Sequence, residues 1–227
     1  MINVIGIDWS GTISDDRKPV YEANMRILEL YGKERITFEE WLKKSTMTAE
    51  QLFINHGIIE STEKLFDLYK KYYTEITGLI EENEHKFYTE ITRPNLPTIY
   101  PDVRYAFNHL KEKKKMIAVL SSHPQENLIE EAEEYGLTDY ISVLIGNSKD
   151  KVKGLKEISR ILNEKLENIL YVGDTVFDIR DAKKAGCLSA AVFGLNGQRG
   201  YHSREMLLKE GPNFPLTSLY ELCDLMI

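Results

Sequence analysis

The chain has 227 residues, a formal net charge of −7, and 42% hydrophobic and 29% charged residues. This composition is typical of a globular protein, and the negative charge argues against nucleic-acid and membrane-surface partners, because both attract basic faces. No apolar run approaches the roughly 18 residues of a membrane span, no signal peptide precedes the first apolar run, and two cysteines are too few for a disulfide framework or a zinc cluster. We therefore expect a cytoplasmic protein.

The first predicted element is a buried β-strand over residues 2–8 that ends in a carboxylate. The apolar run Asn3–Ile7 is followed at once by Asp8-Trp9-Ser10-Gly11-Thr12. Glycine and other small residues after a strand let the backbone turn sharply and bring N–H groups near an anion. Because open α/β sheets bind ligands at the carboxyl ends of their strands, Asp8 lies where a ligand site is expected.

Residues 13–98 have helical patterning and no predicted strand. Pro19 and Gly32 mark the two ends of one helix. The segments Thr37–Glu40 and Thr48–Gln51 have the spacing of capping boxes, and apolar residues recur at helical spacing between Leu65 and Ile76. The pattern predicts an all-helical insert.

After the insert, strands and helices alternate. Short apolar runs predict buried parallel strands at 115–121, 140–145, 168–173 and 188–193, with prolines at helix starts and glycines at helix ends between them. This alternation predicts an α/β fold with a doubly wound, Rossmann-like parallel sheet. We expect one domain from residues 1–14 and 98–227, and a second, all-helical cap domain from residues 15–97.

Three further polar groups occur near the ends of predicted strands. Ser121 and Ser122 end one strand and offer hydroxyls to a phosphate oxygen. Lys151 opens a helix, although the spacing also allows Lys149 as the cation of the same pocket. Gly173-Asp174 and Asp178 follow the strand at 168–173. Two strand ends that carry aspartates predict a nucleophile and a divalent metal site at one sheet edge.

The order Asp-x-x-Gly-Thr, strand-Ser, Lys and Gly-Asp-x-x-x-Asp resembles the motifs of the haloacid dehalogenase-like (HAD) superfamily, most of whose members are phosphatases. The resemblance spans roughly 1–12 and 100–195 and is greatest for the phosphoglycolate phosphatase-like group. It implies a Mg²⁺-dependent phosphohydrolase of a small phosphorylated metabolite, with a helical cap over the core; it indicates no oligomeric state. The implied roles are Asp8 as nucleophile, Lys151 as charge stabiliser, Gly11, Thr12, Ser121 and Ser122 as phosphate contacts, and Asp8, Asp174, Asp178 and the carbonyl of Ser10 as metal ligands.

The chain departs from the family at Ser10, where these phosphatases carry an aspartate that protonates the leaving group and activates water. General acid–base help is worth on the order of 10²–10⁴ in rate. Three alternatives follow: a phosphatase for good leaving groups or with an acid from the cap, a C–P hydrolase, or a phospho-ligand binder without turnover. The first motif resembles the Asp-Trp-Ala-Gly-Thr of phosphonoacetaldehyde hydrolases, but Ala49 stands where their cap lysine is expected, with Lys43 and Lys44 nearby.

Two groups near the site are interpreted as ordinary surface residues. His123, two residues after Ser121, is expected to be a surface loop histidine. The run Glu130–Glu134 is expected to be a solvated helix face.

Overall fold

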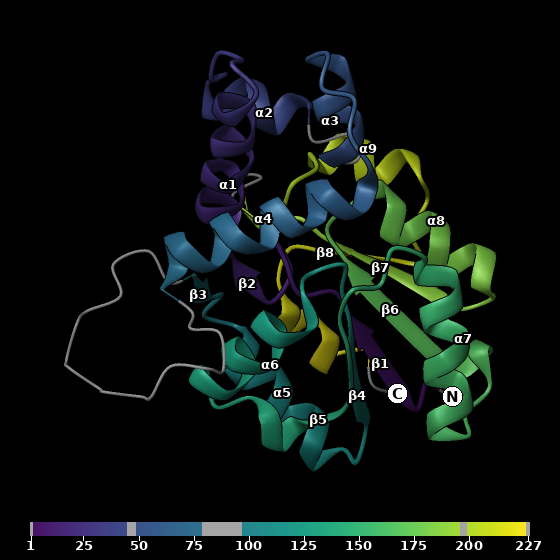
Figure 1. Cartoon of the computed structure of the whole chain (residues 1–227). Helices are drawn as coiled ribbons and strands as arrows, with labels where there is room; N and C mark the ends of the chain where they lie inside the picture. Colours follow the sequence, from purple (N-terminus) through teal and green to yellow (C-terminus); the bar gives the residue numbers. More distant parts are fainter. Residues whose placement is uncertain (1, 45–48, 79–96, 196–198, 226–227) are drawn as a thin grey trace, which may run out of the picture. The chain divides into compact units, whose positions relative to one another are not determined.

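The computed structural model describes residues 2–44, 49–78, 97–195 and 199–225. The chain divides into two compact units (Figure 1). The first, called the sheet unit, comprises Met1–Asp15 and Ile99–Ile227. The second, called the helical unit, comprises Asp16–Thr98.

The sheet unit is built on a six-stranded parallel sheet in the order β5-β4-β1-β6-β7-β8. From β1 the chain passes to β4 and β5 on one side, and later from β6 to β7 and β8 on the other. This reversal between β1 and β6 is the point at which doubly wound sheets bind ligands. The strands are β1 (Val4–Ile7), β4 (Met116–Leu120), β5 (Ile141–Ile145), β6 (Ile169–Gly173), β7 (Leu188–Val192) and β8 (Phe214–Leu216).

Helices flank the sheet, and they pack in two groups (Figure 1). One group joins α7 to α8 over β4, β6 and β7, and the other joins α5 to the 3₁₀ helix η4. The α/β fold with a doubly wound parallel sheet is therefore confirmed. The helices are α5 (Val103–Glu112), α6 (Gln125–Glu134), α7 (Lys151–Leu162), α8 (Val176–Ala185) and α9 (Arg204–Lys209), with 3₁₀ turns η1 (Thr138–Tyr140), η2 (Leu166–Asn168) and η4 (Leu219–Cys223).

The helical unit contains α1 (Arg17–Leu30), α2 (Phe38–Lys44), α3 (Ala49–Asn55) and α4 (Thr62–Thr77). Helices α1 and α4 pack closely, and Ala23 and Tyr73 are fully buried between them. The capping box predicted before α2 is present, because the N–H of Glu40 donates to Thr37 Oγ1 and the N–H of Thr37 donates to Glu40 Oε2. Thr48 of the second predicted box lies outside the described residues.

The structure corrects the strand prediction in two places. Residues 13–98 were expected to contain no strand, yet β2 (Ser14–Asp15) pairs with β3 (Thr98–Ile99). Two residues are too few to produce a period of two in the sequence. Edge strand β8 also escaped prediction because it is short and contains Pro215, which breaks the strand pattern. In the described part of the chain, no helix is long and apolar enough to cross a membrane.

Candidate active site

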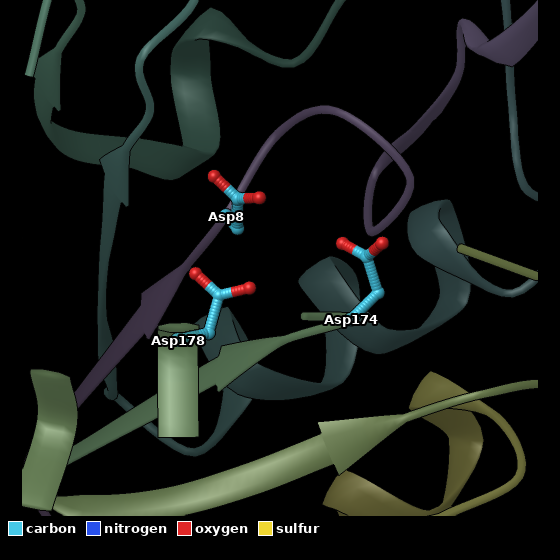
Figure 2. Close-up of side chains that lie close together, drawn as sticks. All are labelled: Asp8, Asp174 and Asp178. Atoms are coloured by element: carbon cyan, nitrogen blue, oxygen red, sulfur yellow. The ribbon is translucent and has the colours of Figure 1, made fainter. Parts of the chain in front are cut away.

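Three aspartates form a carboxylate cluster at the carboxyl edge of the sheet. Asp8 follows β1, Asp174 follows the neighbouring strand β6, and Asp178 lies in the first turn of α8. All three are buried, and one carboxylate oxygen from each lies within 4.8 Å of the others. Figure 2 shows the three carboxylates turned to the same side. They meet because β1 and β6 are aligned in register, with Ile7 opposite Val172.

Lys151, the first residue of α7, contributes the cation of this cluster. Its Nζ lies 2.7 Å from Asp8 Oδ1 and 2.6 Å from Asp178 Oδ1. Lys149, which the sequence also allowed, is exposed. The ammonium group lies 5.4 Å from the centre of the Tyr171 ring. This ring position requires glycine at residue 6, because a Cβ on Gly6 would lie 2.9 Å from the ring. The structure thus brings Lys151 to Asp8.

The charges of the cluster do not balance. Burial raises the pKa of Asp8 from 3.8 to about 7, with Lys151 opposing the shift and Asp178 adding to it. Burial, with the Asp8 and Asp178 charges, also holds the pKa of Asp174 well above its usual value. Burial lowers the pKa of Lys151, but the Asp178 and Asp8 carboxylates outweigh it and hold that pKa well above its usual value. Three buried carboxylates against one ammonium are a donor set that fits a divalent cation with oxygen ligands.

Asp174 is held by two loops that come from distant parts of the chain. Its Oδ1 accepts a hydrogen bond from Thr12 Oγ1 at 2.7 Å, and its Oδ2 accepts one from the Tyr201 N–H at 2.7 Å. Both loops approach through glycines with positive φ. A Cβ on Gly11 would lie 2.5 Å from Asp174 Oδ2, and one on Gly200 would lie 2.6 Å from Asp174 Cβ. Only glycine allows this close approach.

Asp178 combines two contacts that sequence reasoning treated as alternatives. Its Oδ2 accepts hydrogen bonds from the N–H and the hydroxyl of Thr175, which completes a capping box at the start of α8. Its Oδ1 faces Lys151. The same side chain therefore caps a helix and belongs to the charged cluster.

A family model described as haloacid dehalogenase-like hydrolase matches residues 7–192. The chain belongs to this family. It is 25% identical to a phosphoglycolate phosphatase of Vibrio parahaemolyticus over 99% of this chain and 96% of the relative. It is 30% identical to a phosphoglycolate phosphatase of Neisseria meningitidis over 84% of this chain and 80% of the relative.

Solved structures agree on the fold of the family. A haloacid dehalogenase-like hydrolase from Streptococcus pneumoniae superposes with a TM-score of 0.79, covering 100% of this chain and 99% of its own, at 15% identity. At that identity the likeness establishes the fold. The family match and the relatives named phosphoglycolate phosphatase identify the chain as an HAD-family hydrolase of the phosphatase type, as its residue pattern predicted.

The remaining predicted site residues of this HAD hydrolase lie on the same sheet edge or on the loops beside it. Ser121 is buried directly after β4, the strand next to β1, and its Oγ accepts a hydrogen bond from the His123 N–H. Ser122 is exposed. Ser10 is half-buried and forms an isolated β-bridge with Ser14. The structure brings Asp8, Thr12, Lys151, Asp174 and Asp178 into one network of contacts, with Gly11 packed against it.

Sequence reasoning missed the loop after β7 that carries Arg199 and Tyr201. The buried guanidinium of Arg199 donates to the Thr12 carbonyl and, at 2.5 Å, to Asp102, and it lies 4.2 Å from the centre of the Tyr100 ring. The loop therefore holds both Thr12 and Asp174. Its only sequence signal is a glycine next to an aromatic residue after the strand at 188–193, which is weak without the structure.

Two residues interpreted as surface groups are buried. His123 is 3% exposed and Glu131 is fully buried, so the predicted loop surface and solvated helix face are wrong at these positions. Both contact other polar side chains: Glu131 accepts a hydrogen bond from Trp9 Nε1 and lies 3.1 Å from His123 Nε2. Buried polar groups are tolerated when they are paired in this way.

Proposed function

We propose that the chain is a Mg²⁺-dependent phosphohydrolase that transfers the phosphoryl group of a small phosphorylated metabolite to Asp8 and then to water. The contact of Lys151 with Asp8 inside the buried carboxylate cluster carries this proposal. It places a cation against the one carboxylate that must approach an anionic substrate.

The donor set supports a divalent cation at this edge of the sheet. Asp8, Asp174 and the carbonyl of Ser10 would hold it, with Asp178 binding directly or through water. A divalent cation bound there supplies neutralisation of charge on the phosphoryl oxygens and between two reacting anions.

In the first step a carboxylate oxygen of Asp8 forms a bond to phosphorus while the bond from phosphorus to the leaving oxygen breaks. Lys151 keeps Asp8 ionised and offsets charge on the transferring group. The hydroxyls of Ser121 and Ser122 would donate to the phosphoryl oxygens. Gly11 and Thr12 would shape the turn beside them, because their N–H groups and the Thr12 hydroxyl already donate within the chain. In the second step water attacks phosphorus, which releases inorganic phosphate and regenerates Asp8.

The leaving oxygen needs a proton that Ser10 supplies poorly, because a hydroxyl is a far weaker acid than a carboxylic acid at neutral pH. We therefore infer a preference for leaving groups that are stable without protonation, as in acyl phosphates, or an acid from the helical unit acting as a cap. The names of the relatives make phosphoglycolate the first alkyl phosphate to test.

The proposal is tested by assaying phosphate release from acetyl phosphate, p-nitrophenyl phosphate and phosphoglycolate, with Mg²⁺ and with EDTA. Wild type should release phosphate only with Mg²⁺, fastest from acetyl phosphate. Asp8→Asn should be inactive, because an amide oxygen is a poor nucleophile. The matched control Asp139→Asn, on the exposed turn η1, should leave the rate unchanged. Equal phosphate release by Asp8→Asn and wild type would overturn the proposal.

A second candidate is C–P bond hydrolysis, which is favoured by the small residue at position 10 within Asp8-Trp9-Ser10-Gly11-Thr12. Such an enzyme should consume phosphonoacetaldehyde, and borohydride should trap the substrate on Lys43 or Lys44, in the last turn of α2. Failure of both reactions, with phosphate analogues still binding to wild type, would instead identify a phospho-ligand binder.

A further inference from the structure

A buried carboxylate outside the aspartate cluster joins two loops of the site. Glu131 lies on α6 and is fully buried. Its Oε2 accepts a hydrogen bond from Trp9 Nε1 at 2.6 Å, and its Oε1 lies 3.1 Å from His123 Nε2. One side chain thus connects residues that follow β1 and β4.

The Trp9 end of this network controls the loop that carries the nucleophile. Trp9 is bonded to Asp8, and its indole is fixed between Glu131 and the Tyr135 ring, which stacks on it at 6.1 Å. The Trp9 carbonyl accepts hydrogen bonds from the N–H groups of Thr12, Ile13 and Ser14. Rotation of the Trp9 side chain would therefore disturb both the direction of Asp8 and the turn that contains Thr12.

The His123 end controls Ser121. The His123 N–H donates to Ser121 Oγ at 3.2 Å, and its carbonyl accepts from the Asn147 N–H at 2.8 Å. A Cβ on Gly146 would lie 2.9 Å from the His123 carbonyl oxygen, so the backbone is closely packed here. Displacement of the imidazole held by Glu131 would therefore disturb the backbone N–H that donates to the Ser121 hydroxyl.

Burial of a carboxylate is costly, and apolar residues of similar volume often replace buried ion pairs without loss of stability. Stability alone therefore does not account for a glutamate at position 131. We propose that Glu131 is a positioning residue that holds Asp8 and Ser121 in a common geometry through Trp9 and His123. The inference rests on the proposed phosphohydrolase function and adds residues that do not touch the substrate.

The first test compares kcat and KM for p-nitrophenyl phosphate. Trp9→Phe keeps an aromatic ring against Tyr135 but removes the donor to Glu131, and Glu131→Leu removes both links. In each we expect kcat to fall about 10-fold or more with little change in KM, because small displacements of reacting groups cost up to about 10² in rate. Glu131→Gln should stay closer to wild type, since its amide oxygen can accept from Trp9 Nε1 and its NH₂ group can donate to His123 Nε2 in the tautomer that leaves this nitrogen unprotonated.

The matched control is Ser189→Ala in β7, which removes the hydrogen bond that this buried serine donates to Asn213 Oδ1, away from the carboxylate cluster. It should lower the melting temperature and leave kcat of the folded enzyme unchanged. A kcat for Trp9→Phe within about twofold of wild type would overturn the positioning role, and this variant remains informative even where Glu131→Leu fails to fold.

The second test does not depend on activity. The chain has two tryptophans, so Trp41→Phe assigns the indole N–H resonance of Trp9 in an NMR spectrum. His123→Leu should shift this resonance and accelerate its exchange with water, whereas Ser189→Ala should not. An unmoved resonance would overturn the coupling through Glu131. Wild type that releases phosphate from neither acetyl phosphate nor a phosphate ester would instead overturn the proposed function, and the resonance would still decide whether the coupling exists.

Discussion

The ion pairs of the two units are similar in length but different in burial. In the sheet unit, Lys151 lies 2.7 Å from Asp8, and the side chains are 13% and 8% exposed. In the helical unit, Arg26 lies 3.1 Å from Glu75, with side chains 42% and 47% exposed. Water weakens the exposed pair, whereas the buried pair interacts at a lower effective dielectric constant. We therefore expect the loss of stability or activity on removing an ion pair to depend more on its burial than on its length.

The sheet edge should respond most to added or deleted charge, and the largest expected effect is a gain. Ser10→Asp restores a carboxylic acid at the position where the family carries one. We expect kcat on phosphoglycolate to rise by up to about 10²–10⁴, the usual worth of general acid–base help. The gain on p-nitrophenyl phosphate should be much smaller, because that leaving group needs little protonation. High wild-type activity on phosphoglycolate with no gain would contradict this account and favour an acid from the helical unit.

Deletion of the buried cation should be the next largest effect. Lys151→Met removes the ammonium group beside Asp8 and keeps the volume of the side chain. We expect kcat on acetyl phosphate to fall by about 10²–10³, as for loss of one electrostatic stabiliser in an active site. Lys149→Met is the matched control on an exposed lysine two residues away and should have no effect. A larger loss of kcat in Lys149→Met than in Lys151→Met would mean that Lys149, and not Lys151, is the catalytic lysine.

Mg²⁺ should stabilise the sheet unit through the same carboxylates. A ligand at about 100 times its Kd contributes roughly 2.7 kcal/mol, which corresponds to a rise in Tm of several degrees for a chain of this size. Scanning calorimetry should show this rise for wild type with Mg²⁺ and its loss for Asp174→Asn. The helical-unit control Glu75→Gln should keep the full rise. A rise of equal size in Asp174→Asn would mean that the metal binds elsewhere.

The metal-free protein should show the cost of burying Asp8. Burial raises its pKa to about 7, whereas the unfolded chain loses the proton near 3.8. Between these pH values the folded state binds more protons, so its stability falls as pH rises. Asp8→Asn removes this loss, and its Tm in EDTA should exceed that of wild type by about 2–4 °C or more at pH 8 and by much less at pH 5. A variant that is less stable than wild type at pH 8 would contradict this sign.

The predictable part of the site is the part that depends on local sequence. Asp8 and Asp174 each follow an apolar run, so their place at one sheet edge follows from strand ends alone. Spacing allows both Lys151 and Lys149, and the contact of Lys151 with Asp8 agrees with the role that the resemblance assigns to Lys151. The short apolar runs also predict the strands of the six-stranded sheet, apart from the short edge strand that contains Pro215.

The unpredicted part depends on contacts between residues that are far apart in the chain. Glu131 lies in an acidic run, and nothing local separates it from Glu133 and Glu134, which are exposed. Its side chain is buried where it meets Trp9, 122 residues earlier. Arg199 reaches the carbonyl of Thr12 across 187 residues. Helical spacing indicates which face of a helix is apolar, but it does not indicate that one carboxylate on that face has a buried partner.

The smallest effect should come from the exposed ion pair of the helical unit, and a buried pair of an arginine with a carboxylate serves as its comparison. Arg26→Gln removes the pair with Glu75 and should lower the unfolding free energy by less than about 1 kcal/mol, a difference that 0.5 M salt should largely abolish.

Arg199→Gln removes a guanidinium that lies 2.5 Å from Asp102, with both side chains under 10% exposed. It should cost about 3–5 kcal/mol at either salt concentration, because it leaves Asp102 buried without its cation. Urea unfolding at both salt concentrations measures the two losses. Equal losses of unfolding free energy would show that burial does not decide how much each pair stabilises the protein.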